Sequence, residues 1–99
     1  MKVEEATKVK ELLEELGEKA LIARVDSFIA LNEELETKKG EDYIRLSILS
    51  FLEGLLMTLK MKYPGNEKVL ELYEEVRKKR AELDELFRKP AMQNLQEPM

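Results

Sequence analysis

The segment LSILSFLEGLLMTL, residues 46–59, is the most apolar stretch of a chain in which 38% of the residues are charged. Its large apolar residues recur three and four positions apart, which is the spacing of a helix and not the alternation of a strand. Arg45, Glu53 and Lys60 interrupt the apolar run, which is therefore shorter than the ~20 residues that a transmembrane helix needs. We expect this segment to form the central helix of a bundle, with the other helices packed around it.

Helical spacing of apolar residues continues along the chain up to residue 89, and no segment shows sustained alternation. Glycines and prolines divide the pattern, because the apolar stripe shifts in phase at Gly17 and polar turns follow at KKGED and YPGN. The bundle has three helices instead of four if the first helix is continuous through Gly17. The sequence predicts an all-α fold, a small antiparallel helical bundle with four helices near residues 2–16, 18–37, 41–62 and 67–89.

Two residues mark the ends of the last predicted helix. Asn66 is a favoured N-cap residue, because its side chain can accept a hydrogen bond from the first turn of the helix. Pro90 disfavours helical geometry at the residue before it, so we expect the helix to stop there. The sequence thus predicts a helical bundle domain over residues 1–89 and a flexible C-terminal tail over residues 90–99.

The chain contains no cysteine and no histidine. The absence of these two residue types excludes disulfides, imidazole catalysis and metal sites that need a nitrogen or sulfur ligand from a side chain. The formal charge is −4, and acids and bases are mixed along the chain, without the basic surface that nucleic-acid binding needs. The acid-rich first residues also differ from a signal peptide. We expect no cofactor, no nucleic-acid partner and no membrane contact, and a cytoplasmic location.

The third predicted helix carries a second face besides its leucine-rich face. Small residues recur on it at spacings of three and four: Ser47, Ser50, Gly54 and Thr58. Small residues so placed allow another helix to approach closely. The predicted second helix is also apolar on two sides, and together these faces exceed what the neighbouring helices can cover. We predict a homodimer, or another protein partner, with Leu46, Ser50, Gly54 and Met57 near either the partner or the first helix.

Arg45 and Arg80 fall on the core-facing sides of their predicted helices. If they converge, they form an anion contact, and the chain is then a small anion- or nucleotide-binding protein or enzyme that uses nearby carboxylates. Glu53 has apolar neighbours and lies level with Arg77 of the next helix, so we expect it to form an ion pair. The run RKKR, residues 77–80, is surrounded by glutamates at helical spacing and is expected to be paired within the chain.

The strings EELGE, residues 14–18, and ELE, residues 34–36, resemble part of the acidic metal motif of all-helical nucleotide pyrophosphohydrolases of the MazG type. The resemblance implies Mg²⁺ held by carboxylates from two helices. Such strings recur by chance in a glutamate-rich chain, and Gly17 interrupts the helix that would present the ligands. We therefore assign no metal and no catalytic residue.

Abundant lysine and glutamate with few amide side chains is a composition typical of hyperthermophile proteins. In this respect the chain resembles small helical proteins of hyperthermophilic archaea, although no specific motif carries that resemblance. The function that we predict from the sequence is a non-enzymatic interaction or structural module that self-associates.

Overall fold

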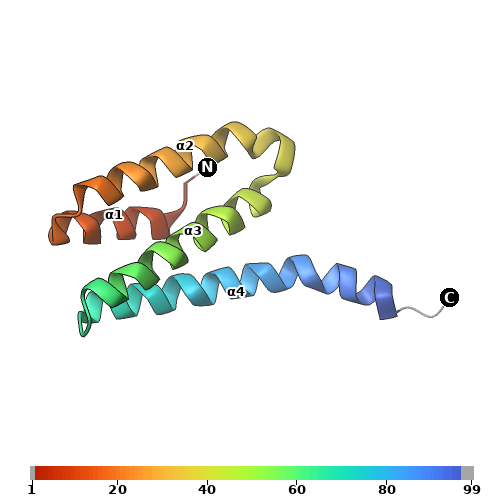
Figure 1. Cartoon of the computed structure of the whole chain (residues 1–99). Helices are drawn as coiled ribbons and strands as arrows, with labels where there is room; N and C mark the ends of the chain where they lie inside the picture. The colour runs from red at the N-terminus through yellow and green to blue at the C-terminus, as the bar shows by residue number, and fades with distance from the viewer. Residues whose placement is uncertain (1, 97–99) are drawn as a thin grey trace.

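The computed structural model describes the backbone of residues 2–96 and the side chains of residues 2–87. Within this part the chain contains helices and turns and no strand. Consecutive helices run antiparallel (Figure 1), and α3 lies between α2 and α4, while α1 contacts α4 directly. The predicted all-α bundle of four helices is confirmed, with the bounds α1 Glu4–Leu16, α2 Lys19–Lys39, α3 Glu41–Lys62 and α4 Glu67–Gln96.

The break between α1 and α2 lies at Gly17, where the apolar stripe shifts in phase. Gly17 has φ 72° and ψ 21°, a left-handed conformation that a β-carbon disfavours. The backbone N–H groups of Gly17 and Glu18 donate to the carbonyl oxygens of Glu14 and Leu13, which satisfies the end of α1. The chain therefore folds as two helical hairpins, and the alternative with one long first helix is wrong.

The last helix, α4, begins where the sequence predicts and ends later. The Asn66 side chain accepts a hydrogen bond from the Val69 N–H at 3.1 Å, so Asn66 is the N-cap. The helix continues past Pro90 to Gln96, and the prediction that Pro90 ends it is wrong. A proline inside a helix removes one donor and crowds the preceding turn, which bends a helix without necessarily ending it. The side chains of residues 90–99 lie outside the described part, and the flexibility predicted for this segment stays a prediction.

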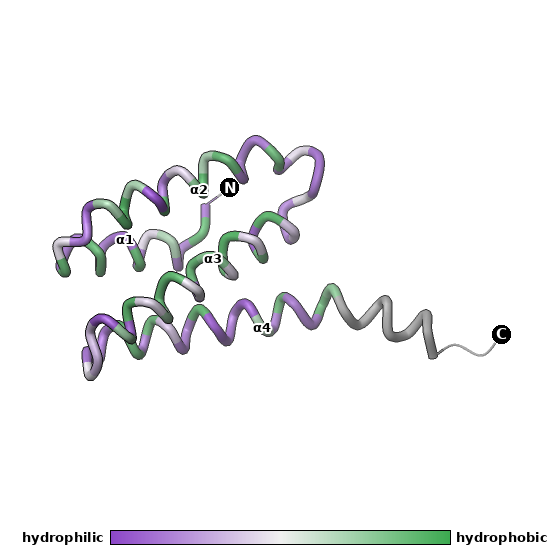
Figure 2. The backbone as a smooth tube through the Cα atoms, viewed as in Figure 1, coloured by the Kyte–Doolittle hydropathy of each residue, from purple (hydrophilic) through white to green (hydrophobic). Residues whose placement is uncertain are grey.

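The hydrophobic core is centred on α3. This helix contacts α1, α2 and α4, whereas α2 and α4 do not contact each other in the described part. Val9 and Leu13 of α1 and Val69 and Val76 of α4 pack into the same core without exposure to solvent. Figure 2 shows that hydrophobic residues are frequent along the whole of α3. All seven buried residues of α3 are apolar: Ile44, Ile48, Leu49, Leu52, Leu55, Leu56 and Leu59.

A cluster of three polar side chains joins the α1–α2 turn to the C-terminal end of α3. Glu18 accepts a hydrogen bond from the Tyr63 hydroxyl and forms an ion pair with the Lys62 ammonium group. The hydrogen bond from Lys62, followed by that from Tyr63, holds the pKa of Glu18 below its ordinary value. The same contacts raise the pKa of Lys62 and of Tyr63. This cluster, which we call the end clasp, ties the two hairpins together at one end of the bundle.

We expect Tyr63→Phe to make the fold less stable towards acid. Because the folded state lowers the pKa of Glu18, this contact stabilises the fold above the unfolded-state pKa and is lost as the pH falls through the folded-state pKa. Without the Tyr63 hydroxyl the folded-state pKa of Glu18 rises, so the stabilisation is lost at a higher pH. Urea unfolding between about pH 6 and about pH 3 measures the change.

The matched control is Tyr43→Phe, at an exposed tyrosine of α3 that takes no part in the end clasp. This variant should keep the acid dependence of the wild type. If NMR titration gives the same pKa for Glu18 with and without the Tyr63 hydroxyl, the end clasp does not act as described.

Candidate functional site

One side of α3 is not covered by another helix, since α2 and α4 flank α3 without touching each other in the described part. Ser50, Gly54 and Thr58 lie exposed along this side. A β-carbon added at Gly54 would meet no atom within 4 Å apart from the backbone of its own helix. We call this side the open face and define it by five residues of α3: Leu46, Ser50, Gly54, Met57 and Thr58.

Two shallow grooves run along the open face, one towards α4 and one towards α2. Ser50 and Gly54 line both grooves, which therefore form one continuous surface. Arg80 and Asp84 of α4 complete the first groove, and Leu21 and Arg24 of α2 complete the second. The open face is thus a trough with α3 as its floor and the two neighbouring helices as its edges.

The four residues predicted at an interface lie together in this trough. Leu46, Ser50, Gly54 and Met57 all line the groove towards α4. No residue of α1 lines either groove, so the first helix is not their neighbour. The expectation that other helices pack around α3 on every side is also wrong. The first helix packs against the leucine-rich side of α3 and therefore leaves the opposite side uncovered. Contact of these four residues with a partner chain stays a prediction.

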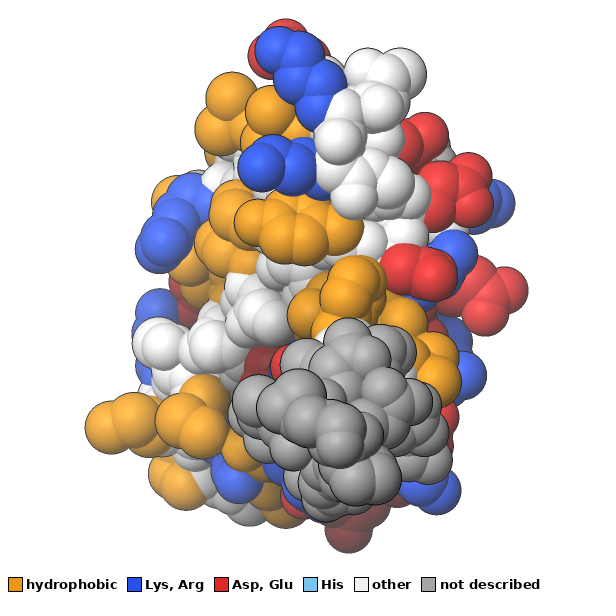
Figure 3. All heavy atoms as spheres, turned by 90° about the vertical axis from the view of Figure 1, so that its right-hand side faces the viewer, with side chains coloured by type: hydrophobic (Ala, Val, Ile, Leu, Met, Phe, Trp, Pro, Cys, Tyr) orange, Lys and Arg blue, Asp and Glu red, His pale blue; other side chains and the backbone are white. Residues whose placement is uncertain are grey.

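Apolar side chains continue from the open face onto α2. Met61 is 81% exposed at the end of α3, and Leu31 of α2 is 62% exposed. Phe28 and Phe51 stack between the two helices, with ring centroids 4.2 Å apart, and line a shallow groove with Leu31. Figure 3 shows hydrophobic side chains gathered in several groups among charged ones on one end of the molecule. The two-sided apolar pattern of the second predicted helix is the sequence signal for this extension.

Glu53 and Arg80 form an ion pair between α3 and α4 at the edge of the open face. The Arg80 Nε lies 2.6 Å from the Glu53 Oε1, and the Nη2 lies 3.4 Å from the Oε2. The Glu53 and Arg80 side chains are 18% and 28% exposed, and the contact raises the pKa of Arg80. The predicted ion pair of Glu53 is confirmed, but its partner lies one turn beyond Arg77, which pairs with Glu74 instead.

The structure does not bring Arg45 and Arg80 into one pocket. Arg80 lines the trough on the open face, where Glu53 and Asp84 already hold its guanidinium group. Arg45 lines a different groove, together with residues of α1 and α4. The anion contact predicted from these two arginines is therefore absent from the described part of the chain.

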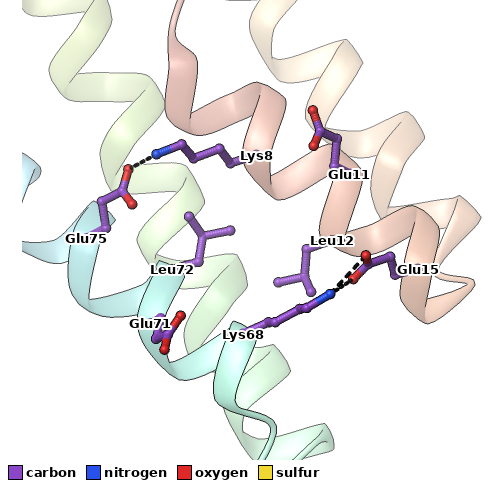
Figure 4. Close-up of a pocket in the computed structure, with 8 residues that line it drawn as sticks. All are labelled: Lys8, Glu11, Leu12, Glu15, Lys68, Glu71, Leu72 and Glu75. Carbon is purple, nitrogen blue, oxygen red and sulfur yellow. Dashed lines mark hydrogen bonds and ion pairs between the residues drawn. The ribbon is translucent and has the colours of Figure 1, made fainter.

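A further groove separates α1 from α4, and ion pairs bridge it at both ends (Figure 4). The Lys8 ammonium group lies 2.8 Å from the Glu75 carboxylate, and Lys68 lies 3.0 Å from Glu15. Leu12 points into the space between the two pairs (Figure 4). Exposed pairs of this kind add little stability each, so the packing of α4 against α1 depends mainly on the apolar core.

The acids of the pyrophosphohydrolase-like strings do not converge on one point. Glu15 pairs with Lys68, and Glu18 belongs to the end clasp. Among the described residues, no group of three or more acidic side chains is placed to hold a metal ion. No helix in the described part is both long enough and apolar enough to cross a bilayer.

A family model described as a protein of unknown function (DUF3216) matches residues 5–97 of the chain. The chain belongs to the DUF3216 family. The crystal structure of a singleton protein from P. furiosus is similar to it, with 43% sequence identity and a TM-score of 0.77. That match covers 84% of this chain and 90% of the P. furiosus chain. No curated protein shows significant similarity to the chain. A homologue in the hyperthermophile P. furiosus agrees with the lysine- and glutamate-rich composition of the chain.

Proposed function

We propose that this DUF3216 protein is a non-enzymatic interaction module that forms a homodimer through the open face of α3. The observation that supports the proposal is the open space above Gly54 on the most apolar helix of the chain. A helix that is apolar around most of its circumference is normally covered on more than one side. Exposed apolar surface that continues across two helices, as it does here to Leu31, is typical of a protein interface.

A second copy of the chain suits the chemistry of this surface. The side chains of Ser50 and Gly54 are small, so two α3 helices can approach closely and gain van der Waals contact. Arg80 pairs with both Glu53 and Asp84 at the α4 edge, so two copies can meet there with these three charges already paired. In a twofold dimer the same patch is used on both chains, which requires a surface compatible with itself.

Replacing Gly54 by leucine tests this interface. The added side chain has room in the single chain, and leucine is favoured over glycine inside a helix by about 1 kcal/mol, so the fold should be kept. Between two α3 helices the same side chain is too large, and overpacking of about 1–3 kcal/mol weakens association by about 5- to 150-fold. Sedimentation velocity over a range of concentrations measures the dimer dissociation constant.

Thr7→Leu is the matched control, because Thr7 is exposed on α1 and lies outside the open face. It should leave the dissociation constant unchanged. A wild-type chain that sediments as a monomer at every concentration refutes the homodimer. A wild-type dimer that Gly54→Leu does not weaken places the interface on another surface.

A further inference from the structure

A separate groove lies where the first turn of α1 meets α3 and α4. Its volume is about 330 Å³, which is within the range of small-molecule sites. It shares no lining residue with the two grooves of the open face. A ligand bound here would therefore be independent of the proposed homodimer.

Glu5 is the buried acid of this groove. It is 8% exposed, and no other described side chain forms a hydrogen bond or an ion pair with it. Lys8, one turn further along α1, feels the charge of Glu5, but its ammonium group is bound to Glu75 at 2.8 Å. The Glu5 carboxylate oxygens are not among the fully buried atoms that lack a partner, so they reach the groove, where a ligand can supply a donor.

Basic side chains line the same groove without a partner of their own. Arg45 of α3 and Lys79 of α4 form no hydrogen bond or ion pair with another described side chain. Among the described residues, three acidic and three basic ones line the groove, so their charges balance. Such a site does not favour a polyanion or a polycation, but it suits a ligand that carries one charge of each sign. Leu49 and Leu83 add an apolar wall.

We infer that this groove binds a small zwitterion with an apolar side chain, of the chemical class of a free aliphatic amino acid. The ammonium group of the ligand donates to the Glu5 carboxylate, and its carboxylate accepts hydrogen bonds from Arg45. The aliphatic side chain packs against Leu49 and Leu83. Binding supplies the missing partner of Glu5 and removes the apolar surface of the ligand from water.

Isothermal titration of the full chain with L-leucine tests the inference. We expect saturable binding that weakens by about tenfold or more in Glu5→Gln and in Arg45→Gln, since each variant loses a charge-assisted hydrogen bond. The matched controls are Glu11→Gln and Lys19→Gln, at exposed residues outside the groove and outside the open face, which should bind L-leucine as the wild type does. Glu5→Gln should melt close to the wild-type temperature, because no described side chain forms a hydrogen bond or an ion pair with the Glu5 carboxylate.

Two analogues separate the contributions of the two charges. Leucinamide lacks the carboxylate and N-acetyl-leucine lacks the ammonium group, so each should bind about tenfold more weakly than L-leucine or worse. The inference is overturned if L-leucine gives no binding up to about 10 mM, or if either analogue binds as tightly as L-leucine. It is also overturned if folded Glu5→Gln binds L-leucine with the wild-type affinity.

Discussion

Leu56→Ala should lower the free energy of unfolding by about 3–5 kcal/mol, which is the largest effect that we expect from any truncation in this chain. Leu56 is fully buried in α3, which contacts the other three helices. The substitution loses the transfer free energy of the deleted carbons and leaves a cavity. The cavity persists because the surrounding helices would all have to move to fill it. Since small domains are stable by only about 5–15 kcal/mol, a loss of this size removes a large part of the total.

Urea unfolding followed by circular dichroism measures this loss, at one fixed protein concentration because self-association would add to the apparent stability. Met61→Ala is the matched control, since Met61 is in the same helix but extends into solvent. Its effect should remain within about 0.5 kcal/mol. A loss below about 1 kcal/mol for Leu56→Ala would mean that α3 is not the centre of the core.

Arg80→Met should destabilise the fold by about 2 kcal/mol, because it leaves the partly buried Glu53 carboxylate without its guanidinium partner. The size is below that of a fully buried pair because both side chains retain some contact with water. The double variant with Glu53→Leu should recover part of the loss, since it removes the uncompensated charge as well. A double-mutant cycle on unfolding free energies isolates the coupling between the two residues.

Arg77→Met provides the comparison within the same helix. Arg77 also pairs with a glutamate, but that pair with Glu74 is exposed on the surface of α4. We expect this control to change stability by about 0.5 kcal/mol or less. If Arg77→Met and Arg80→Met have equal effects, the burial of the Glu53–Arg80 pair contributes nothing to stability.

The features predicted correctly from the sequence are those that depend on residues close together in the chain. The phase shift of the apolar stripe at Gly17 locates the break between α1 and α2, since only an interruption of the helix turns one apolar face away from the next. Asn66 predicts the start of α4 because a capping side chain bonds to its own first turn. The leucine-rich face of α3 likewise needs only the period of a helix to be found.

The features that were missed depend on how one helix lies against another. The sequence places Glu53 on a side of its helix, but the offset of α4 along α3 decides that Arg80, and not Arg77, is opposite. The rotation of both helices likewise decides that Arg45 and Arg80 line separate grooves. The spacing of apolar residues also does not indicate that α2 and the described part of α4 are not in contact, which leaves the open face uncovered.

The end clasp makes the two ends of the bundle unequal. Glu18, Lys62 and Tyr63 tie the hairpins together beside the α1–α2 turn, whereas the opposite end of α2 leaves Leu31 and Leu35 exposed. Local unfolding starts where few buried contacts oppose it. The molecule should therefore fray from the α2–α3 corner inward. Thermal opening of that corner would reach the Phe28–Phe51 stack before the α2 edge of the trough, since Leu21 and Arg24 lie nearer the clasped end.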